Sequence, residues 1–335
     1  MKRHVVAFTA KERAELIEEE IPQLKPGEVL VKTDYDLISA GTELANYHEL
    51  PNTGTTGGKF PVVVGYSTSG HVLEVGSAID DLKPGDRVIC CWGGHRSHQV
   101  SERRRVRKIP DGVDQVEACF AHLASFPMLG VRKLELQLGE GAMVAGLGLL
   151  GLFAVQFAKL CGACPVLACD FSPERRELAK KLGADAVFDP REPDFLDKVK
   201  AATDGRGPDG VVEVTGCISA LQQALEYVAW EGRISLLGCT RISDKTIDFY
   251  KYVHRRGIRI IGAHTSSRPR DESRPGEWTE QDDYRTFFRL LQAGRLQVKP
   301  LMSRLVSPRD CGAVYHEIGF AEKPVYGNVF DWTDF

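Results

Sequence analysis

A glycine-rich segment near the middle of the chain carries the clearest chemical signal. It follows a short apolar run, opens a helical pattern and consists of Gly146, Leu147, Gly148, Leu149, Leu150 and Gly151. The first glycine permits a tight turn, the second lets a ligand approach the backbone, and the third lets helix and strand pack closely. The N–H groups at the start of the helix would face a pyrophosphate. The spacing therefore predicts a dinucleotide-binding loop.

An acidic residue stands where such a loop needs one. Asp170 ends the next expected strand, 19 residues after Gly151, and a carboxylate there accepts hydrogen bonds from the adenosine ribose. Its charge would repel a 2′-phosphate, so we predict NAD as the cofactor. NADP is the alternative, because Arg175 and Arg176 follow at the start of the next helix and could meet that phosphate.

The segments around the loop alternate in type. Short apolar runs predict strands at 142–145, 166–170, 186–189, 210–214, 233–237 and 259–263, and helical patterns separate most of them. Strands with helical crossovers predict a doubly wound parallel sheet, hence an α/β fold. The flanking segments are rich in strand patterns. We therefore expect a Rossmann domain over 125–268, inserted into a β-rich domain formed by 1–124 and 269–335.

Composition excludes several classes of function. Among 335 residues, 43 are Lys or Arg and 46 are Asp or Glu, a formal charge of −3. This balance gives no basis for nucleic-acid or membrane binding. We expect no signal peptide and no spanning helix, because the longest apolar run, 142–158, is interrupted by glycines. The nine cysteines mostly have apolar neighbours, which favours reduced thiols in a cytoplasmic protein.

Motifs along nearly the whole chain resemble the medium-chain dehydrogenase/reductase superfamily, which includes alcohol dehydrogenase. They are Lys-Pro-Gly-Glu at 25–28, Pro-Val-Val-Val-Gly at 61–65, Gly-Asp-Arg-Val at 85–88, the glycine-rich loop, Val-Thr-Gly at 214–216 and the segment 232–238. The resemblance implies a GroES-like domain with a Rossmann domain, a small-molecule substrate, and a homodimer or homotetramer. It also implies cofactor contacts from Thr215 and Gly238.

The chain departs from this resemblance at the zinc sites. Zinc-binding members carry a cysteine where this chain has Ala40, and a His-Glu pair where it has Tyr66 and Ser67. Only Cys90 and Cys91 remain where structural zinc needs four cysteines. We predict no metal in either site. The pattern is similar to a zinc-independent subgroup acting on secondary alcohols or ketones of rings, sugars and polyols.

Without zinc, other groups must stabilise the alkoxide-like substrate oxygen and accept or supply its proton. The resemblance places Thr42, Glu43 and Tyr66 around the vacated position. Thr42 would relay protons, Tyr66 would donate to the substrate oxygen, and Glu43 would orient a partner or bind a hydroxyl. His48 and His95 are further candidate proton carriers.

Two alternative functions remain open from the sequence. One is a zinc-free reductase of quinones or activated C=C bonds, and the other is a dinucleotide-binding protein that has lost catalysis. The polar segment 265–283 is interpreted as a functional or mobile loop. Its arginines would bind an anionic substrate or a neighbouring subunit, or would simply be solvated.

Overall fold

The computed structural model describes residues 2–320 and 326–335. The chain forms two compact units, unit 1 with Met1–Leu123 and Phe287–Phe335, and unit 2 with Ala124–Thr286. The first boundary lies one residue from the position expected from the sequence. The second lies after Thr286 rather than after residue 268, so the segment 269–286 belongs to unit 2.

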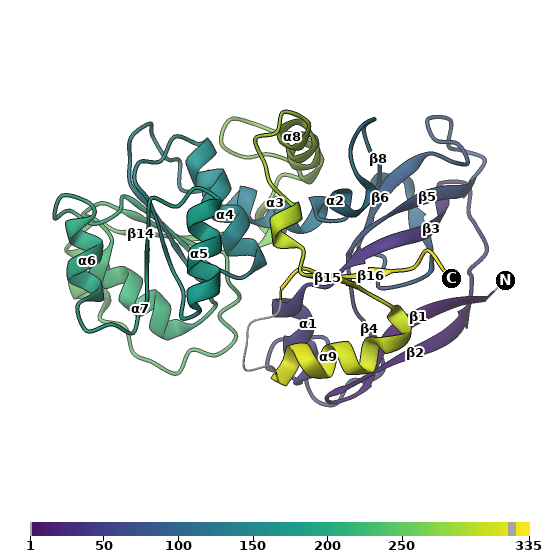
Figure 1. The fold of residues 1–335 in the computed structure, drawn as a ribbon, viewed down its shortest axis with the longest axis horizontal. Helices are drawn as coiled ribbons and strands as arrows, with labels where there is room; N and C mark the ends of the chain where they lie inside the picture. Colours follow the sequence, from purple (N-terminus) through teal and green to yellow (C-terminus); the bar gives the residue numbers. More distant parts are fainter. Residues whose placement is uncertain (1, 321–325) are drawn as a thin grey trace. The chain divides into compact units, whose positions relative to one another are not determined.

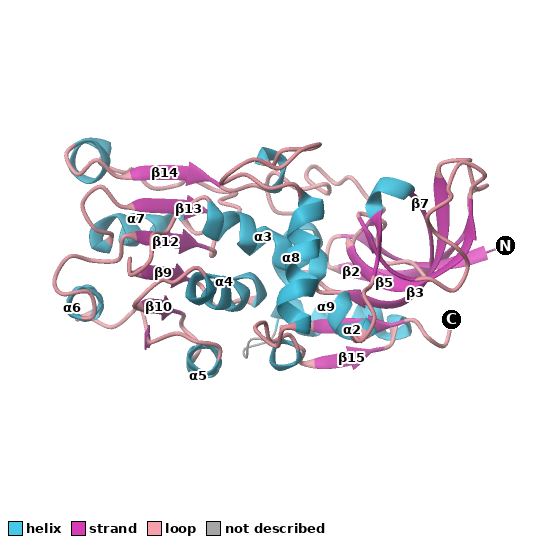
Figure 2. Ribbon diagram, turned by 90° about the horizontal axis from the view of Figure 1, so that it is seen from above, coloured by secondary structure: helices cyan, strands magenta, loops and turns pink. Residues whose placement is uncertain are grey.

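Unit 2 is built on a six-stranded parallel sheet in the order β11-β10-β9-β12-β13-β14. The strands end within one residue of the expected positions and are β9 (Ala142–Ala145), β10 (Val166–Cys169), β11 (Ala186–Phe188), β12 (Gly210–Glu213), β13 (Arg233–Leu236) and β14 (Arg259–Gly262). After β11 the chain returns to the other side of β9, which places the point of reversal between β9 and β12 (Figure 2). This confirms the doubly wound parallel sheet.

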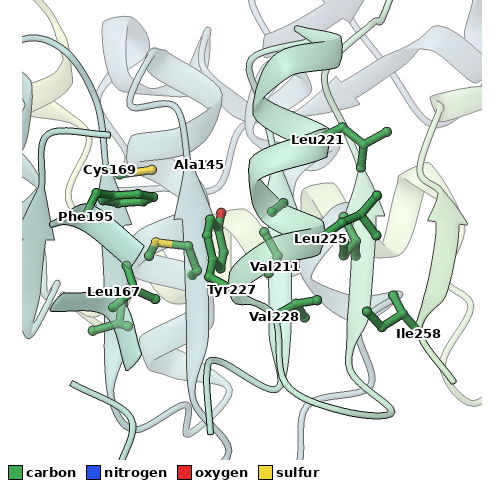
Figure 3. Packing of buried hydrophobic residues seen from close by; sticks show 14 residues of the cluster. Ala145, Leu167, Cys169, Phe195, Val211, Leu221, Leu225, Tyr227, Val228 and Ile258 are labelled. Atoms are coloured by element: carbon green, nitrogen blue, oxygen red, sulfur yellow. The ribbon is translucent and has the colours of Figure 1, made fainter. Parts of the chain in front are cut away.

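Helices connect these strands and cover them with apolar side chains. They are α3 (Ala121–Arg132), α4 (Leu149–Leu160), α5 (Pro173–Lys181), α6 (Phe195–Ala201), α7 (Ile218–Tyr227) and the π-helix η2 (Tyr250–His254). Ser172 caps α5 by accepting a hydrogen bond from the Arg175 N–H, a typical N-terminal signal. In the core, the rings of Phe195 and Tyr227 meet edge to face at 5.7 Å (Figure 3).

Buried ion pairs tie the segment 265–283 to unit 2. It contains η3 (Thr265–Ser267) and the start of α8 (Glu280–Gln292). The Arg268 guanidinium is buried, donates to the Ser125 carbonyl at 2.5 Å, and lies 3.7 Å from the Asp283 carboxylate. Arg132 also pairs with Asp283. Arg268 is thus neither solvated nor presented to an anionic substrate, and these contacts explain the later unit boundary.

Unit 1 contains a three-stranded sheet in the order β2-β1-β4 and a seven-stranded sheet in the order β15-β16-β3-β5-β6-β8, with β7 paired to β3. The strands are β1 (Lys2–Ala10), β2 (Arg13–Glu20), β3 (Glu28–Leu37), β4 (Val62–Val63), β5 (Ser67–Val75), β6 (Arg87–Cys91), β7 (His98–Glu102), β8 (Val106–Lys108), β15 (Arg304–Val306) and β16 (Asn328–Asp331). The helices are α1 (Ala40–Tyr47), α2 (Gln115–Ala118), α9 (Cys311–Phe320) and the 3₁₀ turns η1 (Arg103–Arg105), η4 (Lys299–Leu301) and η5 (Pro308–Asp310) (Figure 1). The GroES-like and Rossmann architecture expected from the sequence is confirmed.

A glycine interrupts the strand pattern at 62–75, and the interruption creates part of the site. Between β4 and β5, Gly65 has φ +96°, and a Cβ there would lie 2.5 Å from the His95 ring. Only glycine fits this combination of backbone angle and close approach. The chain turns at this point and presents Tyr66 immediately before β5.

Within residues 2–320 and 326–335, no helix has both the length and the apolar character needed to span a bilayer. All nine cysteines lie in the described ranges, and each is a free thiol.

Candidate active site

The three glycines of the loop after β9 occupy three different environments. Gly146 has φ +95°, and a Cβ there would lie 2.8 Å from the Thr215 Cγ2. A Cβ on Gly151 would lie 1.9 Å from the Gly146 carbonyl oxygen, so strand and helix approach too closely for any side chain. A Cβ on Gly148, in contrast, would meet no atom within 4 Å. Gly148 is also the N-cap of α4 and brings no capping side chain, which leaves the first helical N–H groups available for phosphate oxygens.

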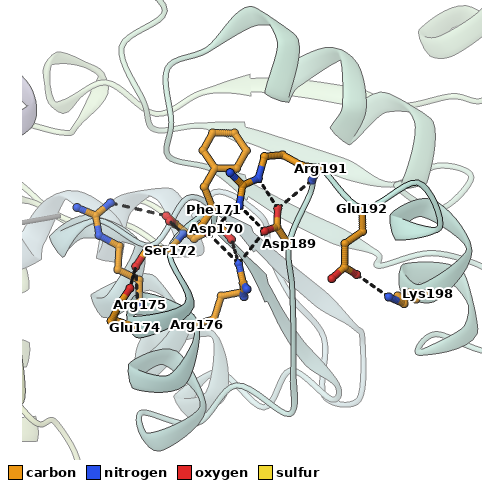
Figure 4. Close-up of polar contacts among 10 residues, drawn as sticks. All are labelled: Asp170, Phe171, Ser172, Glu174, Arg175, Arg176, Asp189, Arg191, Glu192 and Lys198. Carbon is orange, nitrogen blue, oxygen red and sulfur yellow. Dashed lines mark hydrogen bonds and ion pairs between the residues drawn. The ribbon is translucent and has the colours of Figure 1, made fainter. Parts of the chain in front are cut away.

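A pocket of about 490 Å³ adjoins this loop in unit 2, lined among others by Gly146, Asp170, Phe171, Arg175, Thr215 and Cys217. The Asp170 carboxylate accepts a hydrogen bond from the Leu147 N–H at 2.8 Å. It accepts another from the Ser172 N–H at 2.9 Å (Figure 4). These two contacts fix the negative charge at the pocket wall. The loop leucines Leu149 and Leu150 lie in the first turn of α4.

Arginines surround Asp170, but most of their charge is directed elsewhere. Arg176 and Arg191 both pair with Asp189, at 3.2 and 2.6 Å, and these contacts hold the pKa of Asp189 well below its usual range (Figure 4). Arg175 lies 3.8 Å from the Asp170 carboxylate. A ribose at this wall therefore meets an anchored carboxylate with one neighbouring guanidinium.

A buried carboxylate, Glu213, lies at the end of β12, on the other side of β9 from Asp170. Glu213 accepts hydrogen bonds from the Thr215 N–H at 2.7 Å, from the Thr215 hydroxyl and from the Gly216 N–H. Burial raises the pKa of Glu213. A Cβ on Gly238 would lie 2.3 Å from the Gly216 nitrogen. Thr215 thus lines the pocket directly, whereas Gly238 permits the close backbone approach that supports it.

In unit 1, the positions of the family's zinc ligands hold hydroxyls and a methyl group. Ala40 begins α1. Tyr66 is 8% exposed and donates its hydroxyl to the Ser39 Oγ. Ser67 donates its hydroxyl to the Cys119 carbonyl at 2.5 Å, and burial raises the pKa of the Cys119 thiol well above its usual value. The sequence motif contained Ser39, but nothing local marked it as the partner of Tyr66.

An exposed aromatic side chain lies beside Tyr66. Trp92 is 45% exposed and has φ +63°, a conformation that bulky residues rarely adopt. Its ring lies 5.4 Å from that of Tyr66 and edge-on to that of His122 at 4.7 Å. A strained, exposed tryptophan next to a buried hydroxyl pair is a feature that local sequence patterns did not reveal.

The structure places two of the expected catalytic residues in a buried charge network. The fully buried His95 ring has its Nδ1 2.7 Å from Asp36 Oδ2 and its Nε2 3.1 Å from Glu43 Oε2. Glu43 also accepts hydrogen bonds from the Tyr315 hydroxyl and, at 2.8 Å, from the Ser39 N–H. Burial alone would lower the pKa of His95, but the two carboxylates outweigh it and raise that pKa to about 10. Both side chains are thus bound to protein groups.

The other two candidates of unit 1 differ in their surroundings. Thr42 is half-buried in the first turn of α1, three residues after the N-cap residue Ser39. His48 lies at the other end of α1, where its Nδ1 is 3.0 Å from Glu12 Oε1 and its ring meets Phe320 edge-on. The contacts of His48 with Glu12 and Phe320 thus lie at the end of α1 opposite to Ser39.

His95 should contribute strongly to stability in a pH-dependent way. We expect His95→Gln to lower the free energy of unfolding at pH 7 by about 3–5 kcal/mol, because two buried carboxylates lose their cation. Folding raises the pKa of His95 from 6.5 to about 10, so this stabilisation is complete below pH 6.5 and disappears as pH rises through about 10. Urea unfolding should show the difference between parent and variant shrinking between pH 7 and pH 10.5. His71→Gln, which removes a half-exposed pair with Asp34, serves as the control, and an equal loss in both variants would contradict the assignment.

Known proteins match both units of the chain. Residues 25–129 match the alcohol dehydrogenase GroES-like domain, and residues 150–281 match the zinc-binding dehydrogenase family. The L-threonine 3-dehydrogenase of Pyrococcus horikoshii is 31% identical over 323 residues, covering 87% of each chain. The D-guloside 3-dehydrogenase of Escherichia coli is 27% identical, covering 89% of this chain and 91% of the relative. The structure of galactitol-1-phosphate dehydrogenase from Escherichia coli shares the fold, with a TM-score of 0.85 at 21% identity over 98% of this chain and 99% of the other. The chain therefore belongs to the medium-chain dehydrogenase/reductase superfamily of zinc-type alcohol dehydrogenase-like oxidoreductases.

Proposed function

We propose that the protein is an NAD-dependent dehydrogenase that interconverts a secondary alcohol and a ketone on a ring, sugar or polyol, without catalytic zinc. The observation that carries the proposal is the Tyr66–Ser39 hydroxyl pair, in which Tyr66 stands at a ligand position of zinc-binding members and Ser39 precedes another such position, Ala40. The pocket beside Asp170 and the glycine-rich loop support the cofactor. The relatives are named as dehydrogenases of threonine, a guloside and sorbitol, which supports a small polar alcohol.

The residues of unit 2 fit a nicotinamide dinucleotide. The open space at Gly148 and the uncapped start of α4 suit its pyrophosphate, and Asp170 suits the ribose hydroxyls. When bound, the cofactor takes up or supplies the hydride. NAD is favoured over NADP because the Asp170 charge is anchored at the wall, while Arg176 and Arg191 are already paired with Asp189.

The residues of unit 1 do not fit a catalytic zinc. Zinc needs three or four thiolate, imidazole or carboxylate ligands, and the expected positions hold Ala40, Tyr66 and Ser67. The nearby Cys119 is buried, and one thiol alone is too few ligands for zinc. Residues 2–320 and 326–335 contain no group of three or more His, Cys, Asp or Glu side chains able to hold a metal ion.

Hydroxyl groups can take over the role of the metal. When the alcohol C–H bond breaks and its electron pair leaves with the hydrogen, the O–H proton must leave the substrate oxygen. Tyr66 and Ser39 share a hydrogen bond, so Tyr66 can accept the substrate proton while its own proton passes to Ser39, and Ser39 in turn gives up one proton to solvent water. Thr42, in the first turn of α1, would extend this path as a relay.

The exposed ring of Trp92 beside Tyr66 favours a substrate with an apolar face. Trp92 holds a large exposed ring beside Tyr66 in spite of its backbone strain. The C–H face of a sugar or carbocycle would cover such a ring while its hydroxyls face Tyr66 and Ser39. The quinone or C=C reductase and the non-catalytic alternatives have less support, because neither explains the buried hydroxyl pair.

Asp170 should control the choice of cofactor. We expect Asp170→Ala to raise the Kd for NADH about 10- to 100-fold, since hydrogen bonds to a charged group are lost, and to leave NADPH binding unchanged or tighter. Calorimetry with both cofactors measures this. Glu177→Gln, on an exposed i,i+3 pair of α5, is the control. Tight NADPH binding without NADH binding in the parent would show the preference to be wrong.

Tyr66 should act on turnover and not on cofactor binding. Once a screen of secondary alcohols and polyols with both cofactors has found a substrate by absorbance of the reduced cofactor, Tyr66→Phe should lower kcat about 10²–10⁴-fold. The Kd for NADH should stay parental. Thr42→Val should reduce kcat less, and Tyr35→Phe should not reduce it. Parental kcat in Tyr66→Phe together with its loss in His48→Ala would assign the proton to imidazole.

Activity should survive the removal of metal. Dialysis against a chelator should leave kcat unchanged, because Ala40 and Tyr66 offer zinc neither thiolate nor imidazole. Elemental analysis of protein purified without a metal-binding tag should find zinc far below one equivalent. Stoichiometric zinc, or activity restored only by zinc, would overturn the zinc-free proposal.

A further inference from the structure

Glu43 is fully engaged by protein donors and does not face a ligand. Its side chain is 1% exposed. One carboxylate oxygen accepts the Ser39 N–H at 2.8 Å, and the other is 3.1 Å from His95 Nε2 and accepts the Tyr315 hydroxyl. The side chain therefore acts on neighbouring groups of the protein.

The contact with Ser39 fixes the start of α1. Ser39 is the N-cap of this helix, but its own side chain makes no capping hydrogen bond. Glu43 instead reaches back to the backbone of the cap residue, as the acidic member of a capping box does. Because Ser39 is thereby held at its backbone, its Oγ is free to accept the hydrogen bond from Tyr66.

Distant parts of unit 1 hold Glu43 in turn. Tyr315 lies on α9, with its ring edge-on to Phe8 at 4.8 Å and stacked on Tyr47 at 6.0 Å. His95 is held from its other side by Asp36 at the end of β3. Replacing a buried ion pair by apolar residues of similar volume often costs no stability, so stability alone does not explain these buried charges.

We propose that Tyr315 and His95 are positioning residues, which hold the Glu43 carboxylate on the Ser39 N–H and so fix the Ser39 hydroxyl as the partner of Tyr66. The chain of contacts runs from α9 through Glu43 to the N-cap of α1 and ends at the Tyr66 hydroxyl. The importance of this for catalysis rests on the proposed function, in which Tyr66 takes part in proton transfer.

Tyr315→Phe tests the proposal with little change in volume. The variant removes one donor to Glu43 and keeps the ring contacts with Phe8 and Tyr47. Tyr47→Phe is the matched control, because it removes a hydroxyl from a buried neighbouring ring, and that hydroxyl does not hydrogen-bond to Glu43. Protein labelled with ¹³C at tyrosine Cζ has nine such signals, and Tyr66→Phe assigns the one that reports the Tyr66 hydroxyl.

We expect Tyr315→Phe to shift the Tyr66 signal in the same direction as Ser39→Ala, which breaks the hydrogen bond directly. Its kcat should fall about tenfold, the lower end of the range for groups that support a site, while the KM for the alcohol and the Kd for NADH stay parental. Ser39→Thr, which keeps the hydroxyl, should keep the parental signal. Tyr47→Phe should change neither quantity.

The two proposals fail in different ways. A parental Tyr66 signal in Tyr315→Phe, or an equal shift in Tyr47→Phe, overturns the positioning role whether or not an alcohol substrate is found. Absence of any alcohol oxidation or ketone reduction by the parent overturns the proposed function, while the signal still decides whether Tyr315 positions Tyr66.

Discussion

A protonated imidazole held between two buried carboxylates is the constraint on which the site in unit 1 depends. Removing three ionisable groups from water is costly, and the cost is offset only if opposite charges lie close together. The His95 ring meets this requirement, with the Asp36 carboxylate at 2.7 Å on one side and the Glu43 carboxylate at 3.1 Å on the other. The requirement also explains Gly65, whose missing side chain leaves room for the imidazole ring.

In unit 2, carboxylates likewise hold neighbouring groups in place, but their partners are backbone N–H groups. Asp170 holds the N–H groups of Leu147 and Ser172, and Glu213 holds those of Thr215 and Gly216. Each acid follows or ends a parallel strand, so both lie at the carboxyl edge of the sheet, where open α/β sheets bind their ligands. The loops around the pocket are thus ordered by protein contacts before a cofactor arrives, which lowers the entropy that binding must overcome.

The chain keeps the architecture of the zinc-type dehydrogenases while its polar groups have been rearranged. The vacated ligand position holds Ala40, and the neighbouring acid, Glu43, has a histidine and a tyrosine as partners. A metal ion stabilises the negatively charged substrate oxygen through its own charge, whereas hydroxyl groups must be oriented so that they donate hydrogen bonds to that oxygen. In the proposed zinc-free reaction the hydroxyls need rigid support, and we propose that the buried network around Glu43 supplies it on the side of Ser39 and Tyr66.

Local sequence patterns were sufficient to predict much of the fold and of the cofactor site. The parallel strands, the loop from Gly146 to Gly151 and the position of Asp170 were predictable because strand and helix periods, glycine turns and the spacing of the acid are properties of neighbouring residues. In two segments, long-range contacts decide the structure against the local pattern. Gly65 divides the run 62–75 because the His95 ring lies against it, and the segment 265–283 is tied down by Arg268 and Asp283.

The roles of individual polar residues depended on contacts that no local pattern contains. Glu43 and His95 have the side chains of catalytic residues, and their types and positions in the chain allowed that interpretation. They are 52 residues apart in the chain, and Tyr315 is 272 residues from Glu43. Only the packing of α9 and β3 around α1 brings these groups together and buries them. Because they are buried, Glu43 and His95 bind other protein groups, which is why we propose a positioning role for them. The same packing leaves the hydroxyls of Ser39 and Tyr66 paired beside the exposed ring of Trp92.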